Sequence, residues 1–143
     1  TELSVDAASG LTVTGMKVST SATTAAGTYT VGVKGTDKDG KTVSTTVKVT
    51  VAKATVTPSA LTAPSAPAVG TRFNTFKPTF TVAANAGYTL GTPVVTLDGV
   101  DITTAPLSTF ADGDVLTITV PVVADANHTV TSATLTTTVT VAQ

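Results

Sequence analysis

The 143-residue sequence predicts an all-β protein built from two antiparallel β-sandwich modules in tandem. Three observations lead to this prediction. Thr and Val, both β-branched, recur in alternating runs, which suits a pleated strand better than a helix. Residues that favour helices never cluster at a 3.6-residue spacing, so we expect little or no helix. Turn signals rich in Gly and Asp separate the alternating runs, as they do in sandwiches.

The clearest local pattern is a hairpin in the first third of the chain. Residues 28–34 read TYTVGVK and residues 41–52 read KTVSTTVKVTVA, and both alternate with the period of two that is typical of a half-buried strand. Between them lies a turn in which Gly40 supplies a positive φ. The sequence predicts that one face of this hairpin points inward: Tyr29, Val31, Val33, Val43, Thr45, Val47, Val49 and Val51.

Upstream of the hairpin, short apolar runs at residues 3–5, 11–13 and 16–18 predict further strands, with a loop at 19–27. The resulting four or five strands are too few for a seven-stranded sandwich. We therefore expect a first module over 1–53 that looks like the C-terminal part of a sandwich. Three explanations remain open: the chain is a fragment of a longer repeat protein, the module is a truncated sandwich, or a neighbouring subunit supplies the missing strands.

The second module is expected over 54–143. It begins with a Pro-rich and Ala-rich stretch, which indicates either a linker or a first edge strand. In the run 115–123, the most apolar alternating set is predicted to face the core, and Pro121 indicates an edge position or a bulge because it has no N–H. The inward set is Leu116, Ile118, Val120 and Val122. The other predicted strands are 79–83, 88–90, 94–97 and 133–142.

The hairpin residues also carry a resemblance to a family. The run Gly27-Thr28-Tyr29-Thr30-Val31, the turn with Thr36-Asp37 and Gly40, and the run Val47-Lys48-Val49-Thr50-Val51 are similar to the C-terminal half of bacterial immunoglobulin-like repeats of surface proteins. The likeness covers about the first third of the chain. It implies immunoglobulin-like modules and a spacer, display or adhesion role in S-layers, adhesins, extracellular enzymes or phage virions. It transfers no catalytic residue.

Composition argues against several classes of partner. The net charge is −1, and the eight basic residues are spread along the chain, so we expect no nucleic acid partner. The chain has no Cys, which excludes disulfides and thiolate sites. No apolar run reaches the roughly 18 residues of a membrane span. A basic segment followed by an apolar core is also missing at the N-terminus, so we expect no signal peptide in these residues.

Catalytic groups are sparse. The one histidine, His128, lies in a predicted turn without a G-x-S-x-G elbow to provide a nucleophile. Paired carboxylates occur, but the chain has no Trp and few other aromatics to line a sugar cleft. We expect neither an enzyme nor a required cofactor. Calcium is the alternative use of the pairs, because alternate carboxylates can converge on a hard cation. The candidate pairs are Asp37 with Asp39 and Asp112 with Asp114. The other explanation for these residues is that Asp favours turns, because its side chain accepts hydrogen bonds from the backbone.

Phe73, Phe76 and Phe80 are spaced by three and four residues, but the polar residues and the proline around them favour an extended chain. We expect one or more of these rings to anchor the module core. Phe73 and Phe76 are also the first candidates for an interaction surface, if both are exposed together.

These observations predict a non-catalytic structural or adhesive module pair of a bacterial cell-surface or S-layer-type protein, located at the cell surface or outside the cell. A bacteriophage virion protein, such as a capsid decoration or tail component on the virion surface, is the alternative. A carbohydrate-binding accessory module is a third reading, which needs an exposed aromatic platform. The expected partners are neighbouring copies or other domains of such an assembly, without membrane insertion.

Overall fold

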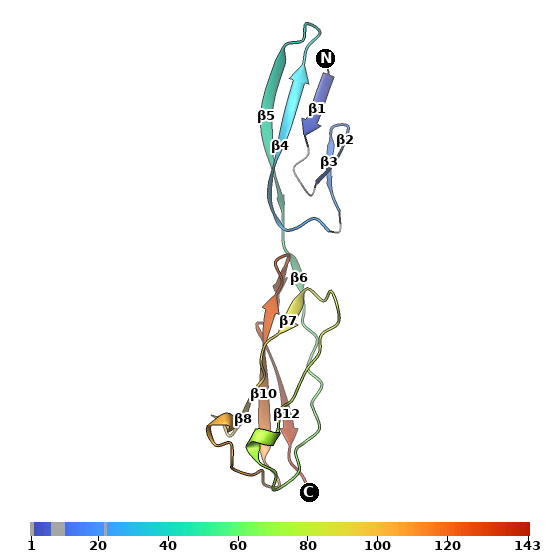
Figure 1. The fold of residues 1–143 in the computed structure, drawn as a ribbon. Coiled ribbons are helices and arrows are strands. Elements are labelled where there is room, and N and C mark those ends of the chain that lie inside the picture. The colour runs from blue at the N-terminus through green and yellow to red at the C-terminus, as the bar shows by residue number, and fades with distance from the viewer. Residues whose placement is uncertain (1, 7–10, 22) are drawn as a thin grey trace. The chain divides into compact units, whose positions relative to one another are not determined.

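A computed structural model describes residues 2–6, 11–21 and 23–143, and for residues 2–6 the backbone alone. The chain is all-β, with several antiparallel sheets and two single 3-10 turns in the described residues (Figure 1). It divides into two compact units, residues 1–54 and 55–143, and each is described by itself. The division lies one residue from the boundary expected from the sequence. Neither 3-10 turn is long and apolar enough to cross a membrane.

The first unit contains a three-stranded antiparallel sheet in the order β1 (Glu2–Asp6), β4 (Gly27–Thr36) and β5 (Thr42–Val51). A separate hairpin joins β2 (Leu11–Thr14) to β3 (Lys17–Thr20). The long β4–β5 hairpin pairs all ten residues of each strand without interruption. Gly40 has the positive φ that was predicted for its turn, 79°. The strands predicted in this third of the chain are therefore confirmed.

The predicted inward face of the hairpin is confirmed for β4 and wrong for part of β5. Val31 is 1% exposed, whereas its cross-strand neighbour Val47 is 48% exposed and Val43 is 73% exposed. Directly paired residues of an antiparallel ladder share one face of the sheet, so Val31 and Val47 lie side by side. Within the part of the unit that the structure describes, this face is buried at Val31 of β4 and exposed at Val43 and Val47 of β5.

The second unit is organised around β10 (Val115–Ala124), which pairs with three other strands. Its main sheet has the order β12-β10-β8-β9, and β7 pairs with the far end of β10. A separate two-stranded sheet joins β6 to β11. The bounds of these elements are β6 Ala54–Val56, β7 Tyr88–Leu90, β8 Val94–Leu97, β9 Val100–Asp101, β11 His128–Val130 and β12 Thr134–Thr140.

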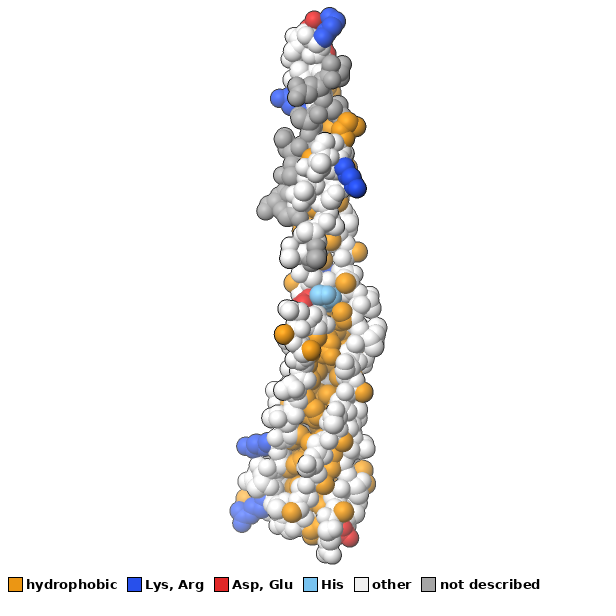
Figure 2. Space-filling view, turned by 90° about the vertical axis from the view of Figure 1, so that its right-hand side faces the viewer, with side chains coloured by type: hydrophobic (Ala, Val, Ile, Leu, Met, Phe, Trp, Pro, Cys, Tyr) orange, Lys and Arg blue, Asp and Glu red, His pale blue; other side chains and the backbone are white. Residues whose placement is uncertain are grey.

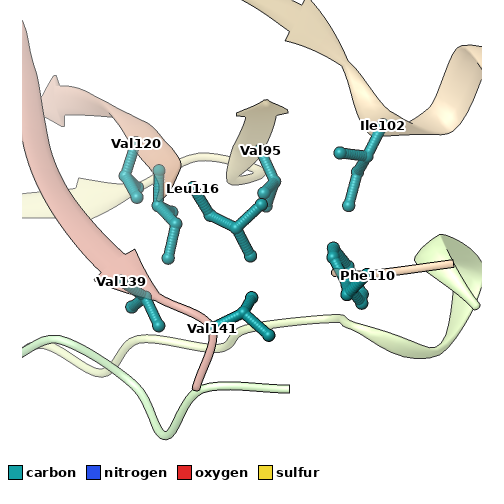
Figure 3. Close-up of a cluster of buried hydrophobic side chains, with 8 residues drawn as sticks. Val95, Ile102, Phe110, Leu116, Val120, Val139 and Val141 are labelled. Atoms are coloured by element: carbon teal, nitrogen blue, oxygen red, sulfur yellow. The ribbon is translucent and has the colours of Figure 1, made fainter. Parts of the chain in front are cut away.

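The core of the second unit lies on one face of β10. All four residues predicted to point inward are buried: Leu116, Ile118, Val120 and Val122. Leu116, Ile118 and Val120 form one cluster with side chains from the neighbouring strands and loops, and Figure 3 shows most of the side chains of this cluster pointing toward one another. The remaining buried members of this cluster are Val95, Ile102, Phe110, Val139 and Val141. The buried members of this cluster are aliphatic side chains with one phenylalanine.

Pro121 occupies the central strand β10, so the prediction of an edge position is wrong. On one side Pro121 pairs with Thr134 of β12. On the other side, β10 pairs with β8 up to Thr119 and with β7 from Val122 onward. Pro121 lies in this gap, where its missing N–H breaks no ladder bond, and its carbonyl accepts a hydrogen bond of 2.8 Å from the N–H of Gly91. The pairing register also shifts by one residue between the two ladders, which agrees with the predicted bulge.

The long segment between β6 and β7 is neither a linker nor a strand. Pro58 is buried, and Leu61 and Phe80 pack against the core cluster. The strand predicted over 79–83 is absent, because the chain there is irregular. This segment contributes side chains to the core of the second unit without joining its sheets.

Candidate functional site

The histidine side chain is paired with a carboxylate. His128, the first residue of β11, places Nδ1 2.6 Å from Oδ1 of Asp125. The Asp125 carboxylate also accepts from the backbone N–H of Asn127 at 2.9 Å. The His128 hydrogen bond, and secondarily that from Asn127, lowers the pKa of Asp125 below its ordinary value of 3.8. The pair closes the turn that leads from β10 into β11.

The first candidate calcium pair lies in the β4–β5 turn. Oδ1 of Asp37 accepts hydrogen bonds from the backbone N–H groups of Asp39 and Lys41, both at 2.9 Å. Asp39 forms an exposed ion pair of 2.9 Å with its neighbour Lys38. These contacts are the turn-forming use of Asp, and they occupy one of the Asp37 oxygens that a cation would need.

The second candidate pair, Asp112 and Asp114, lies in the turn before β10. Oδ2 of Asp114 accepts from the N–H of Ala111 at 2.8 Å, and Oδ1 of Asp112 accepts from the N–H of Gln143 at 3.1 Å. Asp101 caps the 3-10 turn that follows β9 by accepting hydrogen bonds from the N–H and hydroxyl of Thr103. Within the described residues, no three His, Cys, Asp or Glu side chains gather as a metal site.

Phe73 and Phe76 lie together beside the core. Their ring centroids are 4.7 Å and 6.0 Å from that of Phe110, and both rings are half-buried. The prediction that rings of this run anchor the core is therefore confirmed. The stretch is not fully extended, because residues 73–75 form a 3-10 turn. Only part of each ring is accessible, so the two do not form a flat exposed platform.

The accessible edges of these two rings line a groove of about 590 Å³. Most of its walls are apolar, with Asp101 and Lys77 as the charged residues. Figure 2 shows hydrophobic side chains gathered along one face of the second unit. The other apolar residues of the groove are Pro78, Pro93, Val94, Val95, Ile102 and Pro106.

The most distinctive surface of the first unit is the outer edge of β5, because this strand is long and open. It pairs with β4 on one side and, among the described residues, with no strand on the other. An edge strand presents unpaired N–H and C=O groups to any chain that can add to the sheet. The exposed valines Val43 and Val47 lie along this edge.

The sequence did not single out this edge. Alternation placed Val43 and Val47 on the inward face with Val31, and it carries no information on which strand ends the sheet. One available signal was the scarcity of charge: Lys48 is the only charged residue between Thr42 and Val51. Strands that end a sheet ordinarily carry more protection than this.

Comparison of the chain with protein-family models, with curated proteins and with solved structures finds no match. Function is therefore argued from the two units themselves.

Proposed function

We propose that the chain is a non-catalytic structural and adhesive module pair of a bacterial cell-surface or S-layer-type protein, with immunoglobulin-like modules. The open edge of β5 carries this proposal. A ten-residue strand with two exposed valines and a single charge is suited to joining protein chains through sheet extension. A module of this kind acts by contact and spacing, and it needs no reactive side chain.

The contacts of the acidic side chains support a role without catalysis. Asp37, Asp101, Asp112 and Asp114 each accept hydrogen bonds from nearby backbone N–H groups. Such bonds hold turns and chain ends in place. Among the side chains of described residues, no polar or charged residue is buried, so the low-dielectric setting that shifts a catalytic pKa has no counterpart there.

A carbohydrate-binding role has less support. Stacking on a sugar ring needs an aromatic face open to solvent, and the two rings that line the groove, Phe73 and Phe76, are half-buried against Phe110. A virion component remains the alternative, since ordered contact between copies serves a particle surface as well as a cell surface.

Antibodies raised against the purified chain test this proposal in the source organism. We expect immunogold labelling of intact cells. The virion alternative instead predicts labelling of purified virus particles. Label confined to the interior of the cell, with neither cells nor particles decorated, would overturn both. Lysed cells stained with the same antibody provide the control for total antigen.

A further inference from the structure

The free edge of β5 exposes the backbone groups of its polar residues. The N–H of Asp37 donates to the carbonyl of Lys41 at 2.9 Å, which continues the β4–β5 register into the turn. Hydrogen-bonded pairs alternate along an antiparallel ladder, so the odd-numbered residues of β5 turn their N–H and C=O toward β4. The even-numbered residues turn theirs outward: Thr42, Ser44, Thr46, Lys48 and Thr50.

This edge has few of the features that prevent strand addition. Proteins protect edge strands with proline, bulges, several charges or a covering segment. β5 contains no proline, pairs with β4 without a bulge, and carries only Lys48.

We propose that two copies of this chain pair through β5, antiparallel about a two-fold axis at Thr45. This inference rests on the proposed function, and it identifies the protein partner as a second copy of the chain. In this register Val43 of each copy lies opposite Val47 of the other, so the two exposed valines of the edge cover each other. Lys48 lies opposite Thr42 and avoids the Lys48 of the second copy.

Charge selects this register over its closest competitor. Pairing about Thr45 places Lys41, the residue just before β5, of one copy opposite Val49 of the other. Pairing about Val47 places Lys41 across from Lys53, and like charges directly opposite destabilise a pair of strands. The Thr45 register therefore avoids the like-charge repulsion of the competing register.

The product is a continuous six-stranded sheet from two three-stranded ones. Its backbone bonds are made by the pairs Thr42 with Lys48 and Ser44 with Thr46, each formed twice by symmetry. An interface of this kind takes its affinity from main-chain hydrogen bonds and its register from alternate side chains. It also supplies cover for the first unit, where Leu11 and Val31 are the only apolar residues buried among those whose side chains are described.

Sedimentation velocity of the full chain over a range of concentrations tests the proposal. We expect a concentration-dependent dimer for the wild type and for Thr46→Ala, which keeps the N–H. Thr46→Pro removes an outward N–H without touching the β4 ladder, and it should be monomeric with an unchanged circular dichroism spectrum. Val43→Lys provides a second route if the proline variant misfolds, and it should weaken dimerisation at least tenfold. A wild type that stays monomeric at every concentration overturns the proposal.

Cross-linking tests the register, because the chain has no cysteine of its own. Non-hydrogen-bonded partners in an antiparallel pair have Cα atoms about 4.5 Å apart, within the range that a disulfide spans. Thr45→Cys should therefore form a covalent dimer with oxidised glutathione as the oxidant, much faster than Val47→Cys. Equal rates, or faster cross-linking of Val47→Cys, would overturn the Thr45 register.

These outcomes separate this inference from the proposed function. A chain that labels the cell surface but stays monomeric overturns β5 pairing alone. A chain that dimerises as described but labels neither cells nor particles overturns the proposed function alone.

Discussion

Nδ1 of His128 lies 2.6 Å from Oδ1 of Asp125, across the turn that joins β10 to β11. The backbone of this turn is also tied to the β7 side of the sheet, since the N–H of Asp125 donates to the carbonyl of Gly87 at 3.0 Å. The histidine ring, 27% exposed, packs against Gly87 at the same point. The pair thus has a structural role, and it makes stability at this end of the unit depend on pH.

Asp125 should contribute to acid sensitivity. Hydrogen bonding from His128 lowers its pKa below 3.8 in the folded chain. A lowered carboxyl pKa adds stability above the unfolded pKa and loses it as pH falls through the folded pKa. Asp125→Asn should therefore lower the free energy of unfolding at pH 7, and this difference should shrink below about pH 3.

Urea denaturation at both pH values measures this effect, and His128→Gln is the matched control. That variant leaves the carboxylate but removes the imidazole, so it should flatten the same pH dependence. An Asp125→Asn effect of equal size at both pH values would show that the charge contributes nothing.

Gly87 should not tolerate a side chain. A β-carbon there would lie 2.8 Å from Cγ of His128, and the backbone φ is +82°. Gly113 has a similar φ of +86° but open space around it. Both alanine variants carry the strain of a positive φ, and only Gly87→Ala adds the clash. We expect Gly87→Ala to be less stable than Gly113→Ala by about 1–3 kcal/mol, measured by urea denaturation; equal losses would contradict the close packing.

Leu116→Ala should strongly destabilise the second unit. Leu116 is fully buried in the core cluster, and truncation of such a residue to alanine costs about 2–5 kcal/mol. Val115→Ala, one residue away on the exposed face, is the matched control and should change stability by less than about 0.5 kcal/mol. Thermal and urea unfolding of the full chain measure both. Similar losses for the two variants would contradict the assigned inward face of β10.

Calcium should leave the protein unchanged. One Asp37 oxygen is already bonded to two backbone N–H groups, and Asp39 is paired with Lys38. We expect no heat in a calorimetric titration with millimolar calcium and no shift in melting temperature on adding a chelator. Saturable heat that disappears in an Asp37→Asn, Asp39→Asn double variant would show a calcium site in this turn. Asp112→Asn, Asp114→Asn tests the other pair in the same way.

The same alternating pattern had different outcomes in the two units. In β10 it identified Leu116, Ile118 and the other inward residues, all of which are buried. In β5 it placed Val43 on the inward face, yet this residue is 73% exposed. Alternation states which side chains share a face, and whether another layer covers that face depends on residues far away in sequence.

Phe73 and Phe76, which line the groove, also show which features the sequence predicts and which it does not. The sequence placed Phe73 and Phe76 near the core because their neighbours disfavour a helix. Both rings contact Phe110, which lies more than thirty positions further along the chain. The spacing of residues in the sequence does not predict such a contact. The pairing of His128 with Asp125 is local, but the approach of Gly87 to the histidine ring is likewise a product of the fold.

The sequence by itself determined the strand class, the β4–β5 hairpin and the inward face of β10, because β-branched alternation and turn residues act over a few neighbouring positions. The tertiary structure decided that Pro121 lies in a central strand, that irregular chain packs on the core of the second unit, and that β5 is the last strand of its sheet among the described residues. The order of strands in a sheet is set by the burial and hydrogen bonding of segments that are distant in sequence. The open edge of β5, from which the function is proposed, depends on that order.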